Sequence, residues 1–210
     1  LSIGSGSTTG DISTTSAVSV ATGAALRFNR SDAYSFGKVI SGAGAVNQAG
    51  GGTTTLGVAN TYTGTTTVTA GTLSLANPVL AHTSAVVIGT GAFLDLPHGL
   101  TDSVASLTIG AMPQPNGTYG RVDSPTATFK IPQITGDGIL RVGPGFESFM
   151  DEFTGLTAAQ KLPGADPDSD GVTNLMEYAL AGFDPTVPDP SPGTFAGGLL
   201  SFPKRDTAVT

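Results

Sequence analysis

The chain contains no cysteine. Disulfides, thiolate metal sites and cysteine nucleophiles are therefore excluded. Charged residues are also scarce, at 12% of the 210 residues, about half the share in an ordinary soluble domain. No apolar run approaches the roughly 18 residues that span a bilayer, so we expect no transmembrane segment. Abundant threonine and valine argue against disorder, because disordered chains are usually poor in β-branched residues. What remains is a β-rich protein with a polar surface of Thr, Ser, Asn and Gly.

Charge is divided unevenly along the chain. Up to Gly145 the sequence has six acidic and six basic residues, whereas from Phe146 onward it has ten acidic residues against three basic ones. The whole net charge of −7 therefore belongs to the last third. This shift predicts a domain boundary near the breaker Gly143-Pro144-Gly145. No basic patch is available to bind a phosphate backbone, so we expect no nucleic-acid partner.

A short unit recurs through residues 1–142. It consists of a small residue, a glycine, one or two further small residues and then alternating apolar positions. Copies are found at Thr22–Phe28, Ala70–Leu75, Thr90–Leu96 and Gly136–Val142, with weaker ones from Gly42 and Gly50. The glycines at 71, 91 and 110 are 20 and 19 residues apart. A period of about 20 lies at the short end of solenoid repeats.

The alternation predicts short β-strands with one face turned inward. Leu73 and Leu75 share a face, and so do Leu94 and Leu96. A single strand of this kind cannot bury its apolar face alone, but stacked copies form a continuous core. We therefore expect a mainly β fold, a parallel β-solenoid over residues 1–143. An antiparallel sandwich or barrel is the alternative, because it also has short alternating strands and glycine turns.

Residues 51–75 read GGTTTLGVANTYTGTTTVTAGTLSL. This stretch resembles the autotransporter-associated β-strand repeat, whose core joins an Asn-Thr-Tyr-Thr-Gly turn to Thr-rich and Gly-Thr-Leu strands. Shorter pieces of the same kind are Phe28–Asp32, Ile40–Gly44, Gly117–Gly120 and Ile134–Gly138. The resemblance covers most of residues 1–142. It implies a right-handed parallel β-helix passenger that helps an exported protein to fold outside the cell.

The same resemblance implies a secreted or cell-surface protein, associated with the outer membrane of a Gram-negative-type bacterium. Glycans and host or other cell-surface components are the partners expected of an adhesive passenger. The alternative is the C-terminal piece of a larger secreted carbohydrate-active enzyme, since parallel β-helices also house polysaccharide lyases and glycosidases. The chain begins at Leu1 rather than Met and ends at Thr210 among strand-like residues. We therefore expect both ends to be cuts in a longer protein.

The strongest local motif is DPDSDGVTNLME at residues 166–177, which fits the pattern D-x-[DN]-x-[DN]-G-x5-E. Calcium takes six to eight oxygen ligands in a flexible geometry. The pattern supplies three alternating carboxylates, a backbone carbonyl, a direct or water-mediated amide contact and a final bidentate carboxylate. We predict calcium as the cofactor, held in that order by Asp166, Asp168, Asp170, Val172, Asn174 and Glu177. The alternative is an acidic turn without an ion, in which the three neighbouring carboxylates would repel one another.

Residues 144–187 are predicted to form a small helix–loop–helix segment around this motif. An apolar stripe indicates one helix ending at Gly155, and further short helices are expected over Ala158–Leu162 and Asn174–Ala181. The stripe comprises Phe146, Phe149, Met150 and Phe153. The segment resembles EF-hand, dockerin-type and thrombospondin type 3-like calcium loops of bacterial surface proteins. Residues 188–210 are expected to be a Pro-rich tail and the start of a truncated β module.

No strong catalytic group is found in the sequence. Glycoside hydrolysis needs two carboxylates about 5–10 Å apart. Asp95 and Asp102, with His98 between them, are the nearest such pair before the boundary, but turns collect these residue types for ordinary structural reasons. The motifs G-x-S-x-G and H-E-x-x-H and a phosphate loop are all missing. We therefore predict a non-catalytic scaffold, with no catalytic and no cofactor-binding residue besides the calcium ligands.

Overall fold

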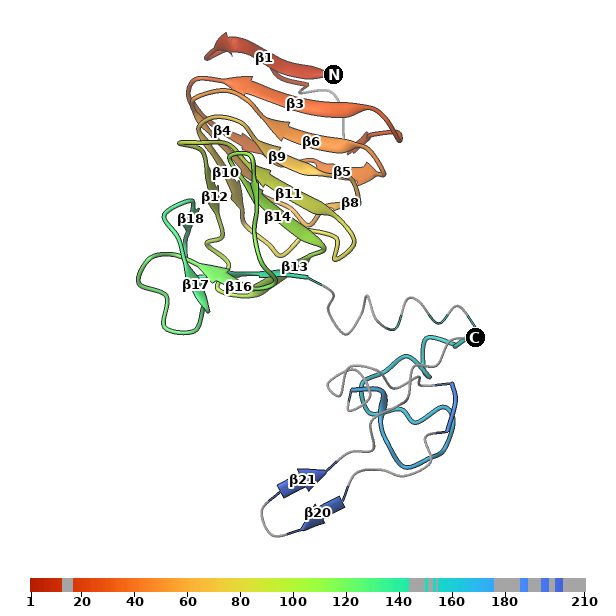
Figure 1. Cartoon of the computed structure of the whole chain (residues 1–210). Coiled ribbons are helices and arrows are strands. Elements are labelled where there is room, and N and C mark those ends of the chain that lie inside the picture. The colour runs from red at the N-terminus through yellow and green to blue at the C-terminus, as the bar shows by residue number, and fades with distance from the viewer. Residues whose placement is uncertain are drawn as a thin grey trace. The chain divides into compact units, whose positions relative to one another are not determined.

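The computed structural model places most of the chain. It describes residues 1–12, 17–143, 150, 153, 155–175, 186–188, 194–196 and 199–201. The chain divides into two compact units, Leu1–Gly145 and Phe146–Thr210 (Figure 1). No helix in the described ranges is long and apolar enough to cross a membrane.

The largest sheet of the first unit has seven strands. Their spatial order is β1 (Ser2–Ser7), β3 (Ala25–Arg30), β6 (Ala45–Gln48), β9 (Thr66–Val68), β11 (Ala85–Ile88), β14 (Ser106–Ile109) and β15 (Met112–Pro113). All neighbours run parallel except β14 and β15. Residues in register are 20 apart in the middle of this sheet, as in Arg27, Asn47 and Thr67. The register thus reproduces the repeat seen in the sequence.

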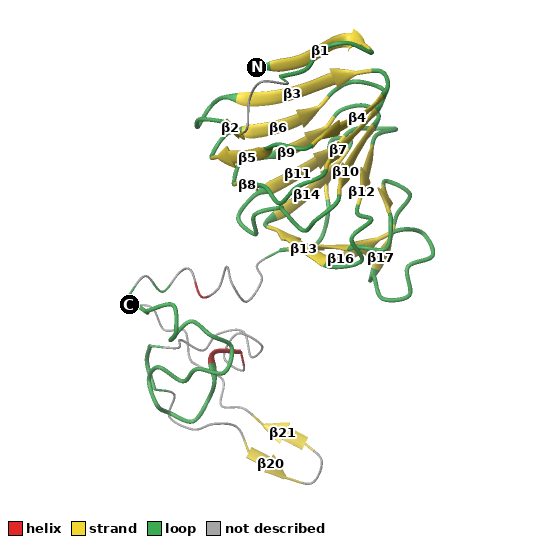
Figure 2. Ribbon diagram, turned by 180° about the vertical axis from the view of Figure 1, so that it is seen from behind, coloured by secondary structure: helices red, strands yellow, loops and turns green. Residues whose placement is uncertain are grey.

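Two further sheets complete the stack. One holds, in order, β18 (Ile134–Thr135), β12 (Phe93–Asp95), β10 (Thr72–Leu75), β7 (Thr53–Leu56) and β4 (Ala33–Phe36); the other holds β2 (Ala17–Ser19), β5 (Val39–Gly42) and β8 (Thr61–Tyr62). Both are wholly parallel. The chain visits the three sheets in turn, so β3, β4 and β5 form one rung and β6, β7 and β8 the next (Figure 2). The unit is a parallel β-solenoid of about 5 turns, which confirms the expected fold and excludes the sandwich or barrel.

The end of the solenoid departs from the repeat. A two-residue turn at Gly110-Ala111 reverses the chain, because Gly110 (φ 62°) adopts the positive φ that such hairpin turns require. A fourth sheet follows, in the order β13 (Thr101–Val104), β19 (Ile139–Val142), β16 (Gly117–Gly120) and β17 (Phe129–Lys130). Strand β19 is parallel to β13 but antiparallel to β16. The repeat copy expected at Gly136–Val142 therefore belongs to this closing sheet and adds no rung to the largest one.

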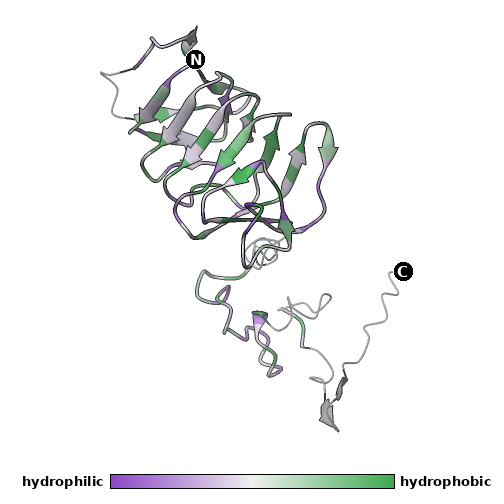
Figure 3. Cartoon of the chain, turned by 90° about the vertical axis from the view of Figure 1, so that its left-hand side faces the viewer, coloured by the Kyte–Doolittle hydropathy of each residue, from purple (hydrophilic) through white to green (hydrophobic). Residues whose placement is uncertain are grey.

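Inward side chains form columns that run through the stack. One column on the largest sheet is at most 1% exposed at every position and consists of Leu26, Val46, Thr66, Val86 and Leu107. On the neighbouring sheet Leu73 lies in register with Leu94, and Leu75 with Leu56. Fully burying each Leu or Val contributes about 1.5–3 kcal/mol relative to exposure. Figure 3 shows hydrophobic residues recurring from strand to strand of the stack. Because each rung buries these residues against its neighbours, a single rung would expose them and would not be stable alone.

The described part of the second unit is built mainly from turns. Thr157 and Gln160 form a reciprocal cap, in which Gln160 Oε1 accepts the Thr157 N–H at 3.1 Å and the Thr157 hydroxyl at 2.8 Å. The helix predicted over Ala158–Leu162 is wrong: these residues form hydrogen-bonded turns. Pro163 explains the difference, since proline disfavours the helical conformation of the residue before it.

Two other helices of the sequence analysis can be followed only in part. The helix expected to end at Gly155 lies mostly outside the described residues, and so does Asn174–Ala181 beyond its first two residues, which are helical. In the tail, β20 (Thr194–Ala196) and β21 (Leu199–Ser201) pair antiparallel.

Candidate metal site

Three aspartates converge in the loop of the second unit. One carboxylate oxygen from each of Asp166, Asp168 and Asp170 lies within 4.8 Å of the others. Within the described ranges this is the one place where three potential metal-binding side chains meet in this way. All three residues are half-buried. The alternate spacing noted in the sequence therefore does bring the three carboxylates together.

The loop is shaped by the aspartates themselves. Asp166 Oδ2 accepts the Gly171 N–H at 3.0 Å, and Asp170 Oδ1 accepts the Val172 N–H at 2.7 Å. Short carboxylates readily bond to nearby backbone N–H groups in this way. Gly171 has a φ of 91°, in the left-handed region that glycine adopts without strain. One oxygen of each of these two aspartates is thus used to hold the backbone in a tight turn.

The remaining oxygens carry the case for a cation. Asp166 Oδ1, Asp168 Oδ2 and Asn174 Oδ1 are all buried without a hydrogen-bond partner. Burying a charged or polar oxygen without a partner is costly, so such groups usually bind a donor or a metal. Burial, together with the negative charges of Asp170 and Asp166, raises the pKa of Asp168. Carboxylate and amide oxygens are hard ligands of the type that calcium prefers.

The other predicted ligands are placed unequally. Asn174 is fully buried, and its Nδ2 donates to the carbonyl oxygens of Gln160 and Leu162. Val172 is 5% exposed, and the role of its carbonyl oxygen stays a prediction. Glu177 lies outside the described residues. The loop motif could not predict the contacts of Asn174 with Gln160 and Leu162, because the motif specifies only the residues that bind the ion.

The two carboxylates considered for catalysis have structural partners. Asp95 accepts hydroxyl hydrogen bonds of 2.7 Å from Ser74 and from Thr135, which lie on the strands at either side of it. Asp102 is 3% exposed, and its Oδ1 accepts the Leu80 N–H at 3.0 Å. Each carboxylate therefore ties neighbouring rungs together.

His98 completes the surroundings of Asp102. His98 Nε2 lies 3.3 Å from Asp102 Oδ2, and both side chains are at most 3% exposed. His98 Nδ1 accepts the Leu100 N–H at 3.1 Å, so the neutral imidazole carries its proton on Nε2, facing the carboxylate. Burial raises the pKa of Asp102, and its backbone donors and His98 lower it by less. The pair is a buried polar cluster of the core.

Asn60 and Asp102 each accept a backbone N–H from about one repeat earlier in the chain. Asn60 Oδ1 accepts the Ile40 N–H at 2.7 Å, across 20 residues, and Asp102 Oδ1 accepts the Leu80 N–H across 22. Ile40 and Leu80 are two repeat periods apart. Sequence reasoning missed this correspondence, although the spacing of Asn60 and Asp102 by about two periods was its signal. Asp102 therefore occupies an asparagine position of the repeat.

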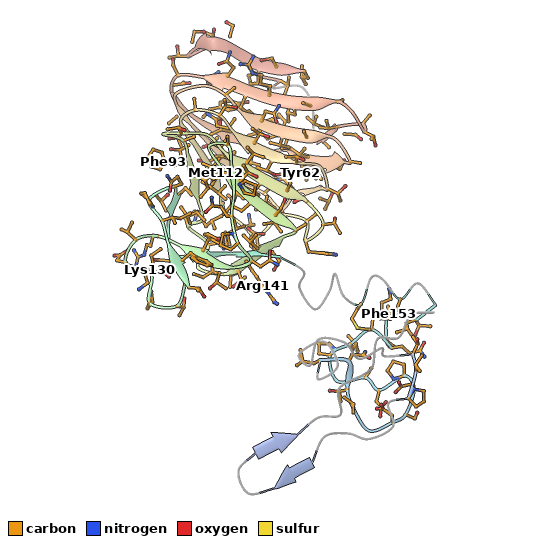
Figure 4. The ribbon with its side chains drawn as sticks, viewed as in Figure 1. Tyr62, Phe93, Met112, Lys130, Arg141 and Phe153 are labelled. Carbon is orange, nitrogen blue, oxygen red and sulfur yellow. The ribbon has the colours of Figure 1, made fainter. Side chains whose placement is uncertain are left out.

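Tyr62 lies in the same region of the core. The residue is labelled in Figure 4 and is 2% exposed. Its hydroxyl shares a hydrogen bond of 2.8 Å with Thr66 Oγ1. Burial raises the pKa of Tyr62 to about 12, against the lowering effect of that hydrogen bond, and the charge of Asp102 adds to the rise. The tyrosine of the Asn-Thr-Tyr turn is therefore a neutral core residue.

Comparison with known proteins bears on the solenoid alone. Residues 46–75 match the family model of the Passenger-associated-transport-repeat. The match begins in β6 and ends with β10, so it covers one full turn and two strands of the next. No curated protein and no solved structure matches the chain. The chain thus carries a passenger-associated transport repeat within a parallel β-solenoid, an architecture that resembles an autotransporter passenger.

Proposed function

We propose that this chain is a non-catalytic passenger scaffold, displayed at the surface of a Gram-negative-type bacterium or secreted from it, and stiffened by one calcium loop. The observation that carries the proposal is the stack of rungs containing a passenger-associated transport repeat. Each rung buries its apolar face only against its neighbours, so the fold extends by adding rungs rather than by enlarging a core. This architecture suits a stalk or an adhesive surface.

The surroundings of Asp95 and Asp102 support a non-catalytic role. Both oxygens of Asp95 accept hydroxyl hydrogen bonds, and Asp102 is buried against backbone N–H groups and His98. A glycosidase needs one carboxyl group free to protonate the leaving group and a second free to attack or to activate water. Asp95 is engaged at both oxygens, and Asp102, at 3% exposed, is closed off from a substrate in solution.

Surface display is tested on intact cells of the producing bacterium. We expect protease added outside to remove the solenoid, detected by an antibody, while a periplasmic marker survives. The same purified chain should bind selected glycans on an array without shortening any polysaccharide. A solenoid that resists the external protease until the cells are broken would contradict surface display. Reproducible polysaccharide cleavage would contradict the non-catalytic role.

Calcium is the cation that the loop would hold. Asp166, Asp168 and Asp170 would supply carboxylate oxygens, Asn174 its amide oxygen, and Val172 and Glu177 the remaining two ligand positions. Bound calcium would neutralise the clustered charge and join residues that are otherwise held apart by repulsion. An affinity in the micromolar to millimolar range is expected for an extracellular structural site.

We expect Asp168→Ala to weaken calcium binding at least about tenfold, equivalent to about 1.4 kcal/mol, because it removes a half-buried carboxylate from the group of three. Titration calorimetry on the whole chain at pH 7 measures the affinity. Asp123→Asn is the matched control, since Asp123 is an exposed carboxylate beside Arg121 in the solenoid. A wild-type chain without any calcium heat or calcium-dependent melting would refute the site.

A further inference from the structure

Asn174 connects the calcium loop to a segment that the loop motif does not include. Its Nδ2 donates to the carbonyl oxygens of Gln160 at 2.6 Å and Leu162 at 2.8 Å. The backbone adds two more bonds, from the Asn174 N–H to Ala165 O at 2.9 Å and from the Leu175 N–H to Pro163 O at 3.0 Å. Four hydrogen bonds therefore hold residues 160–165 against the second half of the loop.

These contacts fix the orientation of the Asn174 amide. An amide group has two N–H donors and one acceptor oxygen, and two carbonyl acceptors can be satisfied only by the nitrogen. With the nitrogen on Gln160 and Leu162, the oxygen is directed away from them. That oxygen is buried without a partner in a fully buried residue. Asn174 thus offers one end of its side chain to a ligand while the other end holds the backbone.

The held segment has little stability of its own. The cap formed by Thr157 and Gln160 starts a single turn, in which the Lys161 N–H donates to Thr157 O at 3.1 Å. Pro163 prevents the turn from continuing as a helix. The segment's other internal backbone bonds run from the Leu162 N–H to Ala159 O and from the Ala165 N–H to Leu162 O. Isolated turns of this length are unfavourable in water, because fixing the backbone costs more than so few hydrogen bonds return. Residues 157–165 therefore depend on the contacts that Asn174 and its neighbours provide.

We propose that Asn174 is a positioning residue that couples calcium binding to the closure of residues 157–165. This inference rests on the calcium site proposed above. Without the cation, the clustered carboxylates repel one another and the loop carrying Asn174 opens, so the two carbonyl contacts are lost together. With the cation, the Asn174 oxygen is held at the site and its nitrogen closes on Gln160 and Leu162. Calcium thereby controls a second segment through one side chain.

The Lys161–Leu162 peptide bond reports on this closure. It lies inside the coupled segment, and Leu162 is 58% exposed, so endoproteinase Lys-C reaches it whenever the segment opens. We expect saturating calcium to slow cleavage at Lys161 at least about tenfold, because cleavage follows the population of the open form and calcium lowers that population. Cleavage after Lys130 in the solenoid, measured in the same digest by mass spectrometry, should not respond to calcium.

Two substitutions separate holding the segment from binding the ion. Asn174→Asp keeps an oxygen for calcium but replaces the N–H donors by an acceptor that faces two carbonyl oxygens. We expect this variant still to bind calcium, because its added charged ligand offsets part of the roughly tenfold affinity that closure supplies, and to lose the protection of Lys161. Asp168→Ala should lose both calcium binding and protection.

Each other outcome is decisive. Full protection of Lys161 in Asn174→Asp would overturn the proposal, because the segment would then close without the two amide bonds to Gln160 and Leu162. A wild-type chain that binds calcium in the calorimeter without protecting Lys161 would defeat the coupling and leave the calcium site standing. A wild-type chain that binds no calcium would refute the site itself.

Discussion

Gly64→Ala, in the turn between β8 and β9, should markedly lower the unfolding temperature of the solenoid. A Cβ added at Gly64 would lie 2.1 Å from Gly44 O and 2.4 Å from Gly44 C. These are backbone atoms of the rung below, held in the stack by its parallel ladders, so they cannot move aside. Overpacking against a rigid neighbour costs about 3 kcal/mol. For a unit of this size we expect a fall of about 10 °C, measured by scanning calorimetry.

Gly57→Ala is the control within the same repeat. A Cβ at Gly57 meets nothing within 4 Å, and its φ lies outside the left-handed region. Alanine there reduces the freedom of the unfolded chain and should leave the melting temperature unchanged or slightly raised. Equal losses in the two variants would show that close stacking of rungs is not what requires the glycine at 64.

The rungs were predictable because the repeat of about 20 residues and the alternation of apolar residues both follow from burying one face of each strand between stacked neighbours. Leu73 and Leu94 share a column in the structure, which fits the stacking of equivalent strands that the sequence predicts, since a parallel stack with short corners places such residues above one another. The closing sheet was not predictable in this way. Gly136–Val142 has the composition of a rung, but its pairing with β13 and β16 depends on the chain reversal at Gly110, a tertiary event that local pattern does not encode.

In the metal loop, too, one part could be predicted from the sequence and another could not. The alternation of Asp166, Asp168 and Asp170 was enough to expect converging carboxylates, because the pattern fixes both the ligand types and the turn. The contacts of Asn174 with Gln160 and Leu162 lie 14 and 12 residues away along the chain. No rule of spacing relates an amide side chain to those carbonyl groups, so only the folded structure reveals them.

Asp102→Ala should destabilise the solenoid by about 3 kcal/mol. The substitution removes the acceptor of the buried Leu80 N–H and leaves His98 buried opposite an apolar side chain. Asp102→Asn should lose about 1–2 kcal/mol at pH 7, because an asparagine oxygen can accept the same N–H, as Asn60 does for Ile40, whereas its Nδ2 donor then faces the His98 Nε2–H. Urea denaturation of both variants measures the free energies of unfolding.

The pH dependence of the same variants has a defined sign. Burial raises the pKa of Asp102 above its ordinary value of 3.8. A group with a raised folded-state pKa contributes stability that is complete below its unfolded pKa and is lost as the pH rises through the folded one. The wild type should therefore gain stability relative to Asp102→Asn as the pH falls from 7 towards 4. His98, which faces Asp102, lowers this pKa by less than burial raises it.

Comparing wild type and Asp102→Asn isolates this carboxylate, because both chains share every other acidic residue. Asp11 and Asp32, whose pKa values are lowered by their bonds to Tyr34 and Arg30, drive the opposite trend in each chain and cancel in the difference. A difference that grows in favour of Asp102→Asn on acidification would mean that the bond to His98 outweighs burial. Asp102 would then be an ion-pair residue, and its equivalence to Asn60 would fail.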